Sequence, residues 1–198
     1  MKKQPLHKYL WVASAVYLAL GFVNILFAWL GMACFLIPLL ISTFHGNKTY
    51  CHKYCGRGQL LDMLGRKCGL SRNRDIPPVL RSKAFRYGFL VFFMFMFFNM
   101  ILATYLVFSG AKDLSSVVTL LWTIRLPWQW AAGDTGIAPW ITQYAFGFYS
   151  VMLTSTLLGL VTMVLYKPRS FCVYCPMGTM TQGICKLKHR KDEQLLLQ

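Results

Sequence analysis

The chain has 198 residues, of which 56% are hydrophobic and only 14% are charged. Soluble domains carry about 25% charged residues, so this composition is typical of a membrane protein. Lysine and arginine outnumber aspartate and glutamate by 21 to 6, which gives a net charge of +15. A nucleic-acid-binding protein would not also have a mean hydropathy of +0.46. The aromatic content excludes a disordered chain, and seven cysteines, a small and odd number, exclude a secreted domain held by disulfides.

Three long stretches of the chain contain no charged residue, at residues 9–44, 87–111 and 141–166. A membrane-spanning helix needs about 20 apolar residues, so the second and third stretches predict one spanning helix each. The first stretch would form a helix of about 54 Å, too long for a hydrocarbon core of about 30 Å. We therefore predict a helical hairpin with helices at 8–27 and 30–45 and a turn near residues 29–31. A re-entrant segment is the alternative.

The distribution of basic residues predicts the membrane topology. Of the 21 lysines and arginines, 19 lie in the N-terminal tail, in residues 46–86 or after Tyr166, and only Lys112 and Arg125 lie in residues 112–140. By the positive-inside rule, this split predicts four spanning helices with both termini cytoplasmic, in a bacterial-type inner membrane. The basic residues then set the orientation of the protein in the membrane and attract the lipid bilayer, and they do not bind nucleic acid. For the outer segment we predict a short amphipathic helix on the membrane surface.

Two short segments of the chain resemble each other. Residues 50–60 read YCHKYCGRGQL and residues 171–180 read FCVYCPMGTM, and each follows an apolar stretch at a similar distance. We infer a duplicated unit of two helices and a cysteine motif, with repeats at residues 1–83 and 84–198 in a single membrane domain. The predicted fold is thus an all-α integral membrane protein of two tandem helical hairpins. Repeats that run in the same direction would bring both motifs to the cytoplasmic face.

The two cysteine pairs, Cys51 with Cys55 and Cys172 with Cys175, are the residues most able to carry chemistry. Stable disulfides are rare in the cytoplasm, where such pairs are more often metal ligands or redox groups. Two converging pairs supply the four thiolates that one iron–sulfur cluster requires. Four thiolates also suit a tetrahedral zinc ion, and the spacing alone leaves both possibilities open.

The three remaining cysteines are less informative. Cys34 lies in an apolar stretch and is interpreted as a packing residue. Cys68 follows Cys55 by 13 residues, and Cys185 follows Cys175 by 10. Each is either an additional ligand or a plain thiol.

The motifs FCVYCPMGTMTQG, at 171–183, and YCHKYCGRGQL, at 50–60, resemble the membrane part of NapH- and NosR-type iron–sulfur proteins, the polyferredoxins. The resemblance implies a 4Fe-4S cluster and membrane-associated electron transfer between a quinol pool or flavin and a redox partner. The chain departs from that pattern in three ways: Gly56 replaces a proline, the second motif is C-x2-C, and no ferredoxin domain follows Cys175. We therefore expect one cluster here and partner redox subunits for the rest.

The leading hypothesis is an integral-membrane electron-transfer protein, a component of an oxidoreductase system rather than a stand-alone enzyme. One cluster at the cytoplasmic face, shared by the two cysteine pairs, would pass electrons to a quinone or a partner subunit. A soluble ferredoxin- or flavodoxin-type carrier would dock on the basic 46–86 segment, guided by its opposite charge. The alternatives are a membrane thiol–disulfide oxidoreductase, whose active pairs face the oxidising side, and a zinc-stabilised, non-catalytic assembly subunit.

Overall fold

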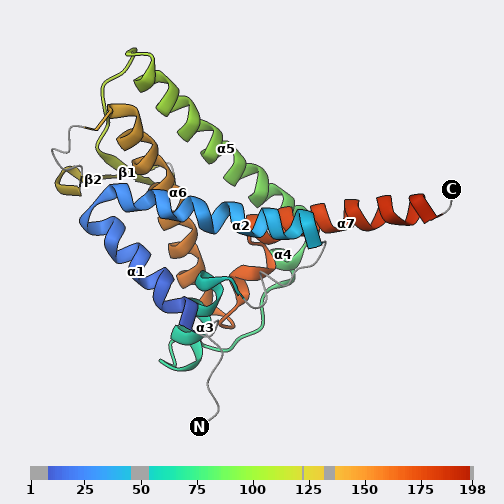
Figure 1. The fold of residues 1–198 in the computed structure, drawn as a ribbon. Coiled ribbons are helices and arrows are strands. Elements are labelled where there is room, and N and C mark those ends of the chain that lie inside the picture. The colour runs from blue at the N-terminus through green and yellow to red at the C-terminus, as the bar shows by residue number, and fades with distance from the viewer. Residues whose placement is uncertain (1–8, 46–53, 122, 132–136, 197–198) are drawn as a thin grey trace, which may run out of the picture. The chain divides into compact units, whose positions relative to one another are not determined.

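A computed structural model describes residues 9–45, 54–121, 123–131 and 137–196 of the protein. Most of these residues are helical (Figure 1). The α-helices are α1 (Leu10–Val23), α2 (Leu30–His45), α3 (Gly56–Arg66), α4 (Pro78–Arg81), α5 (Lys83–Phe108), α6 (Pro139–Leu165) and α7 (Pro176–Leu196). Short 3-10 helices are η2 (Ile25–Trp29), η4 (Gln129–Ala131) and η5 (Ser170–Val173), and the two strands are β1 (Val117–Leu120) and β2 (Ile124–Pro127).

Three helical segments among the described residues are long and apolar enough to cross a membrane. They are Ile25–Phe44, Lys83–Phe108 and Pro139–Leu165. The last two coincide closely with the predicted spans, and all three are compatible with a membrane protein. Helix α1, with 14 residues, is shorter than a span requires. Four spans in two hairpins therefore stay a prediction.

The first apolar stretch breaks earlier than predicted, at Asn24 rather than near residues 29–31. Asn24 has an extended backbone, with φ −142° and ψ 121°, and its side chain accepts a hydrogen bond from the N–H of Leu26 at 3.0 Å. This contact caps η2, because asparagine side chains readily replace a missing helical acceptor. Hydrophobic periodicity does not locate this break, because the residues on both sides of Asn24 are uniformly apolar.

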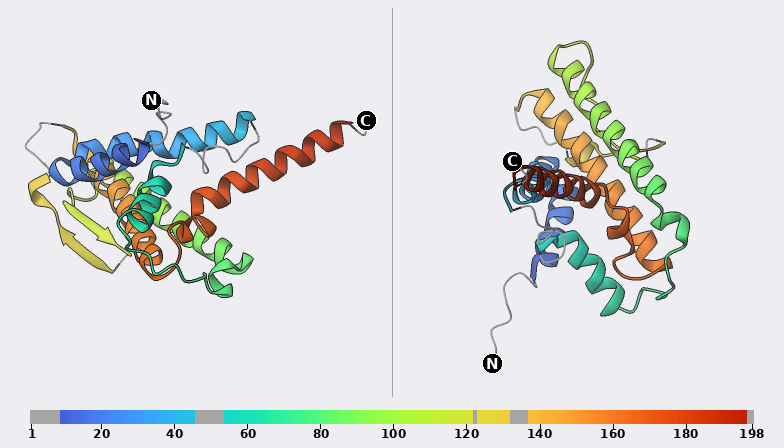
Figure 2. Two further views of the ribbon diagram at one scale, coloured as in Figure 1. Left: turned by 90° about the horizontal axis from the view of Figure 1, so that it is seen from below. Right: turned by 90° about the vertical axis from the view of Figure 1, so that its right-hand side faces the viewer.

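Residues 117–127 form a β-hairpin, so the expectation of an amphipathic helix there is wrong, while the expectation of a mostly helical fold is confirmed. Strands β1 and β2 pair antiparallel, with Val117 opposite Pro127 and Leu120 opposite Ile124 (Figure 2, yellow). Alternation places Val118 fully inside while its neighbours are half-buried, a pattern of period two that suits β-branched residues. The chain reverses through Leu121, whose φ is +48°.

The chain divides into two compact units, and each takes segments from both predicted repeats. We call them the hairpin unit (Ala15–Met32 and Val91–Leu158) and the cysteine unit (Met1–Ser14, Ala33–Leu90 and Gly159–Gln198). The repeat boundaries at residues 83 and 84 describe a sequence duplication and stay a prediction.

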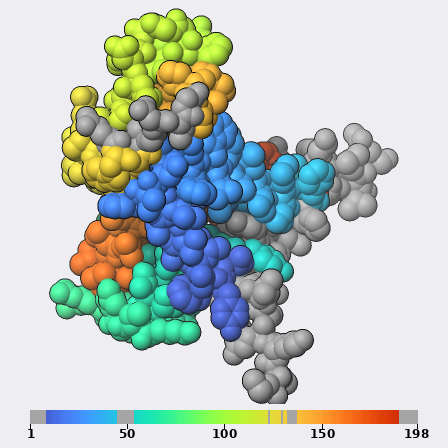
Figure 3. Space-filling model, turned by 60° about the vertical axis from the view of Figure 1, so that its left-hand side comes forward, coloured from blue at the N-terminus to red at the C-terminus, as the bar shows by residue number. Residues whose placement is uncertain are grey.

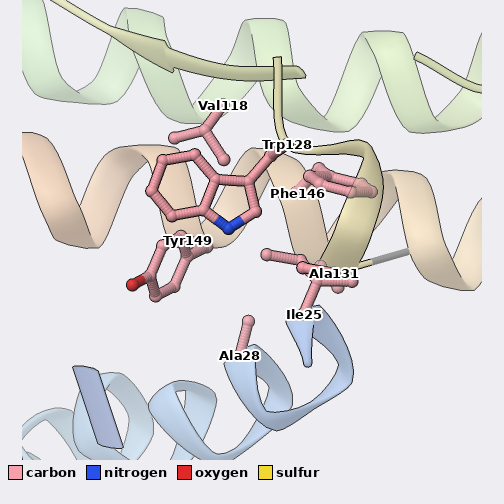
Figure 4. Close-up of a cluster of buried hydrophobic side chains, with 8 residues drawn as sticks. Ile25, Ala28, Val118, Trp128, Ala131, Phe146 and Tyr149 are labelled. Atoms are coloured by element: carbon pink, nitrogen blue, oxygen red, sulfur yellow. The ribbon is translucent and has the colours of Figure 1, made fainter. Parts of the chain in front are cut away.

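The core of the hairpin unit lies where the β-hairpin meets the turn that follows α1. Trp128 packs there with Val118, Ile25, Phe146 and Tyr149 (Figure 4). The surface view shows the same neighbourhood from outside, with the yellow hairpin segment against the blue residues of the turn (Figure 3). The apolar side chains of the hairpin therefore anchor it on the helices of its own unit.

The cysteine unit is held together by contacts of α3 and α7 with the ends of the long helices. Gly159 of α6 lies against Leu61 of α3. Ser42 of α2 donates to the Thr181 carbonyl of α7 at 3.1 Å. Lys188 donates to the Phe44 carbonyl at 2.7 Å, which satisfies an acceptor that the end of α2 leaves free. These contacts bring the segments that carry both cysteine motifs into one unit.

Candidate metal centre

The second cysteine of each motif stands immediately before a helix. Cys55 is the N-cap of α3, and its carbonyl accepts the N–H of Gln59 at 3.0 Å. Cys175 precedes α7, and its carbonyl accepts the N–H of Thr179 at 2.9 Å. The two motifs therefore share a local backbone arrangement at their second cysteine. Both sulfurs therefore lie at the N-terminal end of a helix, where the backbone N–H groups point toward them.

The sulfurs of the two motifs meet around Gly58. Its N–H donates to Cys55 Sγ at 3.5 Å. A Cβ atom built on Gly58 would lie 3.6 Å from Cys55 Sγ and 3.7 Å from Cys172 Sγ. The charges of Cys175 and Cys55 both act on Cys172. The structure thus brings three of the four predicted ligands together, while Cys51 falls outside the described residues.

Arg57 brings a positive charge to these sulfurs. Its Nη2 donates to Cys175 Sγ at 3.3 Å, and its guanidinium carbon lies 5.2 Å from the centre of the Phe171 ring. Burial acts to lower the pKa of Arg57, but the charges of Cys175, Cys55 and Cys172 outweigh burial, and the pKa is raised. A half-buried guanidinium favours negative partners, and sulfur atoms are among those that act on Arg57.

The pKa of the Cys172 thiol is raised, although the residue is exposed at the protein surface. Partial desolvation by the surrounding protein is the main cause, and the charges of Cys175 and Cys55 add to it, so that the pKa rises to about 12 although Arg57 and Arg169 act the other way. Metal ions bind thiolates rather than thiols. Loading of this site therefore releases protons, and the metal supplies the positive charge that stabilises the sulfur anion.

The other cysteines fall into three different surroundings. Cys34, interpreted from the sequence as a packing residue, is exposed on α2 and interacts electrostatically with Cys55 and Arg57. Cys185 is buried in α7, where its sulfur lies 3.4 Å from Ser42 Oγ. Cys68 is exposed beyond the end of α3. Cys185 and Cys68 are therefore not among the residues that the structure gathers around Gly58.

The donor set suits a group larger than one ion. Thiolates are the preferred ligands of both zinc and iron–sulfur clusters. Within the described part of the chain, no three side chains of histidine, cysteine, aspartate or glutamate are grouped closely enough for a single metal ion. The missing side chain of Gly58 leaves the space between the sulfurs open, so the residues fit a cluster.

A basic cavity lies close to the second motif. It has a volume of about 510 Å³ and is lined by Arg66, Lys167 and Arg169 among other residues. Arg66 and Arg169 both pair with Asp62, at 2.9 and 3.4 Å. Because the charge of Arg169 also acts on Cys172, this cavity and the sulfurs share an electrostatic environment.

A comparison with known protein families connects this arrangement to a cofactor. The 4Fe-4S binding domain family matches the chain in two stretches, residues 27–77 and 150–192. The two stretches contain both cysteine motifs, and the β-hairpin lies between them. The match supports an iron–sulfur protein whose cofactor is an iron–sulfur cluster of the 4Fe-4S type. No curated protein and no solved structure shows significant similarity to the chain.

Two residues of the site were not singled out by sequence reasoning. The basic residues of the 46–86 segment were assigned to membrane topology and carrier docking, and nothing in the sequence selected Arg57 from its neighbours. Gly58 was one of several glycines beside the cysteines. Their position could have drawn attention to Arg57 and Gly58, because both fall within three residues of Cys55 and lie at the start of α3.

Proposed function

We propose that the chain is an integral-membrane electron-transfer protein with one 4Fe-4S cluster bound by Cys51, Cys55, Cys172 and Cys175. The observation that carries this proposal is the approach of the Cys55 and Cys172 sulfurs to the same point beside Gly58, 3.6 and 3.7 Å from its Cβ position. Two motifs that are more than a hundred residues apart would not converge on one point if each bound its own metal. The family match to both motifs supports the same cofactor.

The proposal places the cluster at the cytoplasmic face of a bacterial-type inner membrane. Three apolar helices support a membrane location. The concentration of lysine and arginine in the segments that flank both motifs supports a cytoplasmic face for them, with both termini on the same side. The NapH- and NosR-type arrangement, with a quinone or a partner redox subunit as electron acceptor, is the finer form of this proposal.

A soluble acidic electron carrier is the proposed donor. Arg66, Lys167 and Arg169 line an open cavity on the cysteine unit, and the 46–86 segment adds further basic residues. Opposite charges increase the rate at which such a carrier associates, and this gain falls with ionic strength. Ferredoxin- and flavodoxin-type carriers have the required acidic character.

The two alternative functions fit the site less well. A membrane thiol–disulfide oxidoreductase has its active pair on the oxidising side, whereas the basic residues around both motifs favour the cytoplasmic face. A structural zinc site would use the same four thiolates, and the family match to both motifs favours the iron–sulfur cluster. Both alternatives nevertheless make measurable predictions, a redox-active disulfide and bound zinc.

The function can be tested by anaerobic electron transfer. Protein purified in detergent is mixed with a reduced flavodoxin-type carrier, and the visible absorbance of the cluster is followed. We expect bleaching at a rate that falls as salt is added, and recovery of the absorbance when a soluble quinone analogue is supplied. Cys172→Ser protein is the control and should show no cluster absorbance. A cluster that exchanges no electrons with either reagent would contradict the electron-transfer role.

A further inference from the structure

The geometry points to Arg57 as a non-ligating member of the cluster site, which raises the reduction potential of the cluster by donating to the Cys175 sulfur. This inference rests on the proposed function. Arg57 belongs to the first motif, yet its Nη2 donates to the second cysteine of the other motif at 3.3 Å. The residue therefore links the two halves of the site without providing a ligand.

The position of the guanidinium is fixed from several directions. Arg57 is the second residue of α3, directly after the helix start that Cys55 caps. Its guanidinium carbon lies 5.2 Å from the centre of the buried Phe171 ring, a cation–π contact that holds a flat cation in place. Phe171 in turn packs edge-on against Tyr174 and Phe89, at centroid distances of 5.1 and 6.2 Å. The Arg57 guanidinium, held in this way, donates to the Cys175 sulfur with no rearrangement of its side chain.

The charged groups around Arg57 indicate which part of the site its positive charge stabilises. The described ion pairs of the cysteine unit connect Asp62 with Arg66 and Arg169, and Asp75 with Lys167. Cys175, Cys55 and Cys172 are negative groups that act on Arg57, with Cys175 the largest contributor among them. A half-buried cation beside these sulfurs is stabilised when the sulfurs carry negative charge. They do so when they bind a cluster.

The consequence for the cluster follows from its change of charge. Reduction adds one electron to a group that four thiolates already make negative, and no bond forms or breaks. A nearby half-buried positive charge stabilises the reduced state more than the oxidised state. Net charge and hydrogen bonds to sulfur are two of the factors that set the potential of such clusters. Arg57 supplies both and therefore raises the potential.

The test compares the reduction potentials of the wild type, Arg57→Gln and Arg57→Lys by EPR-monitored titration, with iron and sulfide measured on the same samples. Arg57→Gln removes the charge, and Arg57→Lys keeps a charge but loses the planar donor. We expect both variants to retain iron and the potential to fall, more for Gln than for Lys. Lys186→Gln is the matched control, because it removes an exposed charge from α7, the helix that follows Cys175, at a position outside the basic cavity. Its potential should equal that of the wild type.

Three results separate this inference from the proposed function. Iron-loaded Arg57 variants with the wild-type potential would overturn the role of Arg57 and leave the cluster assignment intact. A wild type without iron would overturn the proposed function itself. If Arg57→Gln does not fold or load iron, Arg57→Lys decides: a lowered potential supports the inference, and an unchanged potential overturns it.

Discussion

At the scale of single residues, Gly58 keeps the space between the two cysteine motifs open. It has no side chain at the point that faces both Cys55 and Cys172, and its N–H donates to the first of them. The distances of 3.6 and 3.7 Å that a Cβ would make are ordinary van der Waals contacts. A methyl group here would therefore be tolerated by the protein chain but would occupy space that the cluster needs.

The substitution Gly58→Ala should thus separate folding from cofactor binding. We expect a folded protein that retains iron about tenfold less well, the lower end of the effects seen for changes around metal ligands. The measurement is the iron content after gel filtration in the presence of a chelator. Gly183→Ala in α7, where no atom lies within 4 Å of the new Cβ, is the control. Equal iron retention in both variants would show that Gly58 does not border the cofactor.

The candidate ligands could be predicted from the sequence, but their environment could not. Cysteine spacing and repetition are local patterns, so the pairs were recognisable without a structure. The contact of Arg57 with Cys175 joins residues 118 positions apart, and no local pattern encodes it. The raised pKa of Cys172 likewise depends in part on the charge of Cys55, which belongs to the other motif.

At the scale of elements, the start of α3 depends on its close approach to α1. A Cβ on Gly56 would lie 2.7 Å from the Leu10 carbonyl oxygen and 2.4 Å from Ser14 Oγ. The carbonyl belongs to the backbone of α1 and cannot rotate away. Glycine at this position is therefore a requirement of packing, and it explains why the proline of the resembling motifs is absent here.

We expect Gly56→Ala to lower the free energy of unfolding by about 1–3 kcal/mol, the range for overpacked interior sites. Thermal unfolding in detergent, followed by circular dichroism, measures the change. Gly88→Ala in α5 meets no atom within 4 Å and should leave the midpoint unchanged or slightly higher. A Gly56→Ala protein as stable as the wild type would mean that α3 does not pack on α1 in this way.

Two neighbouring tryptophans test the placement of the β-hairpin, which is the second prediction at the scale of elements. Trp128 is 7% exposed in the core of the hairpin unit, whereas Trp130 is 59% exposed. Trp128→Ala should cost about 3–5 kcal/mol, as for other buried aromatic residues. Trp130→Ala should cost about 1 kcal/mol, mainly its hydrogen bond to the Phe22 carbonyl. Chemical unfolding measures both, and equal costs would contradict the placement of the hairpin.

The long helices were predictable because composition alone defines them, and the hairpin was not. Helices α5 and α6 agree with the uncharged stretches to within a few residues, since a run of apolar residues must be helical to satisfy its backbone in lipid. In the outer segment the tryptophans suggested an amphipathic helix. Burial of Val118 and Trp128 in one cluster favoured a strand pairing that helical periodicity does not reveal.

At the scale of the whole molecule, the proposed topology can be tested with a membrane-impermeant maleimide and site-by-site mass spectrometry. Cys68 is exposed and belongs to the proposed cytoplasmic face, so it should be labelled in inverted vesicles but not in intact cells. A cysteine introduced by Lys112→Cys should show the opposite pattern. Labelling of Cys68 in intact cells would place the motifs on the outer face and favour thiol–disulfide chemistry.

The central claim is that two distant motifs hold one cluster, and an EPR spectrum with metal analysis tests it most directly. The protein is purified anaerobically, and iron, sulfide and zinc are measured before and after reduction with dithionite. We predict about four irons per chain, as in one 4Fe-4S cluster, and a reduced-state signal that disappears in both Cys55→Ser and Cys175→Ser. Bound zinc without iron, or a signal that survives the loss of either motif, would contradict the account.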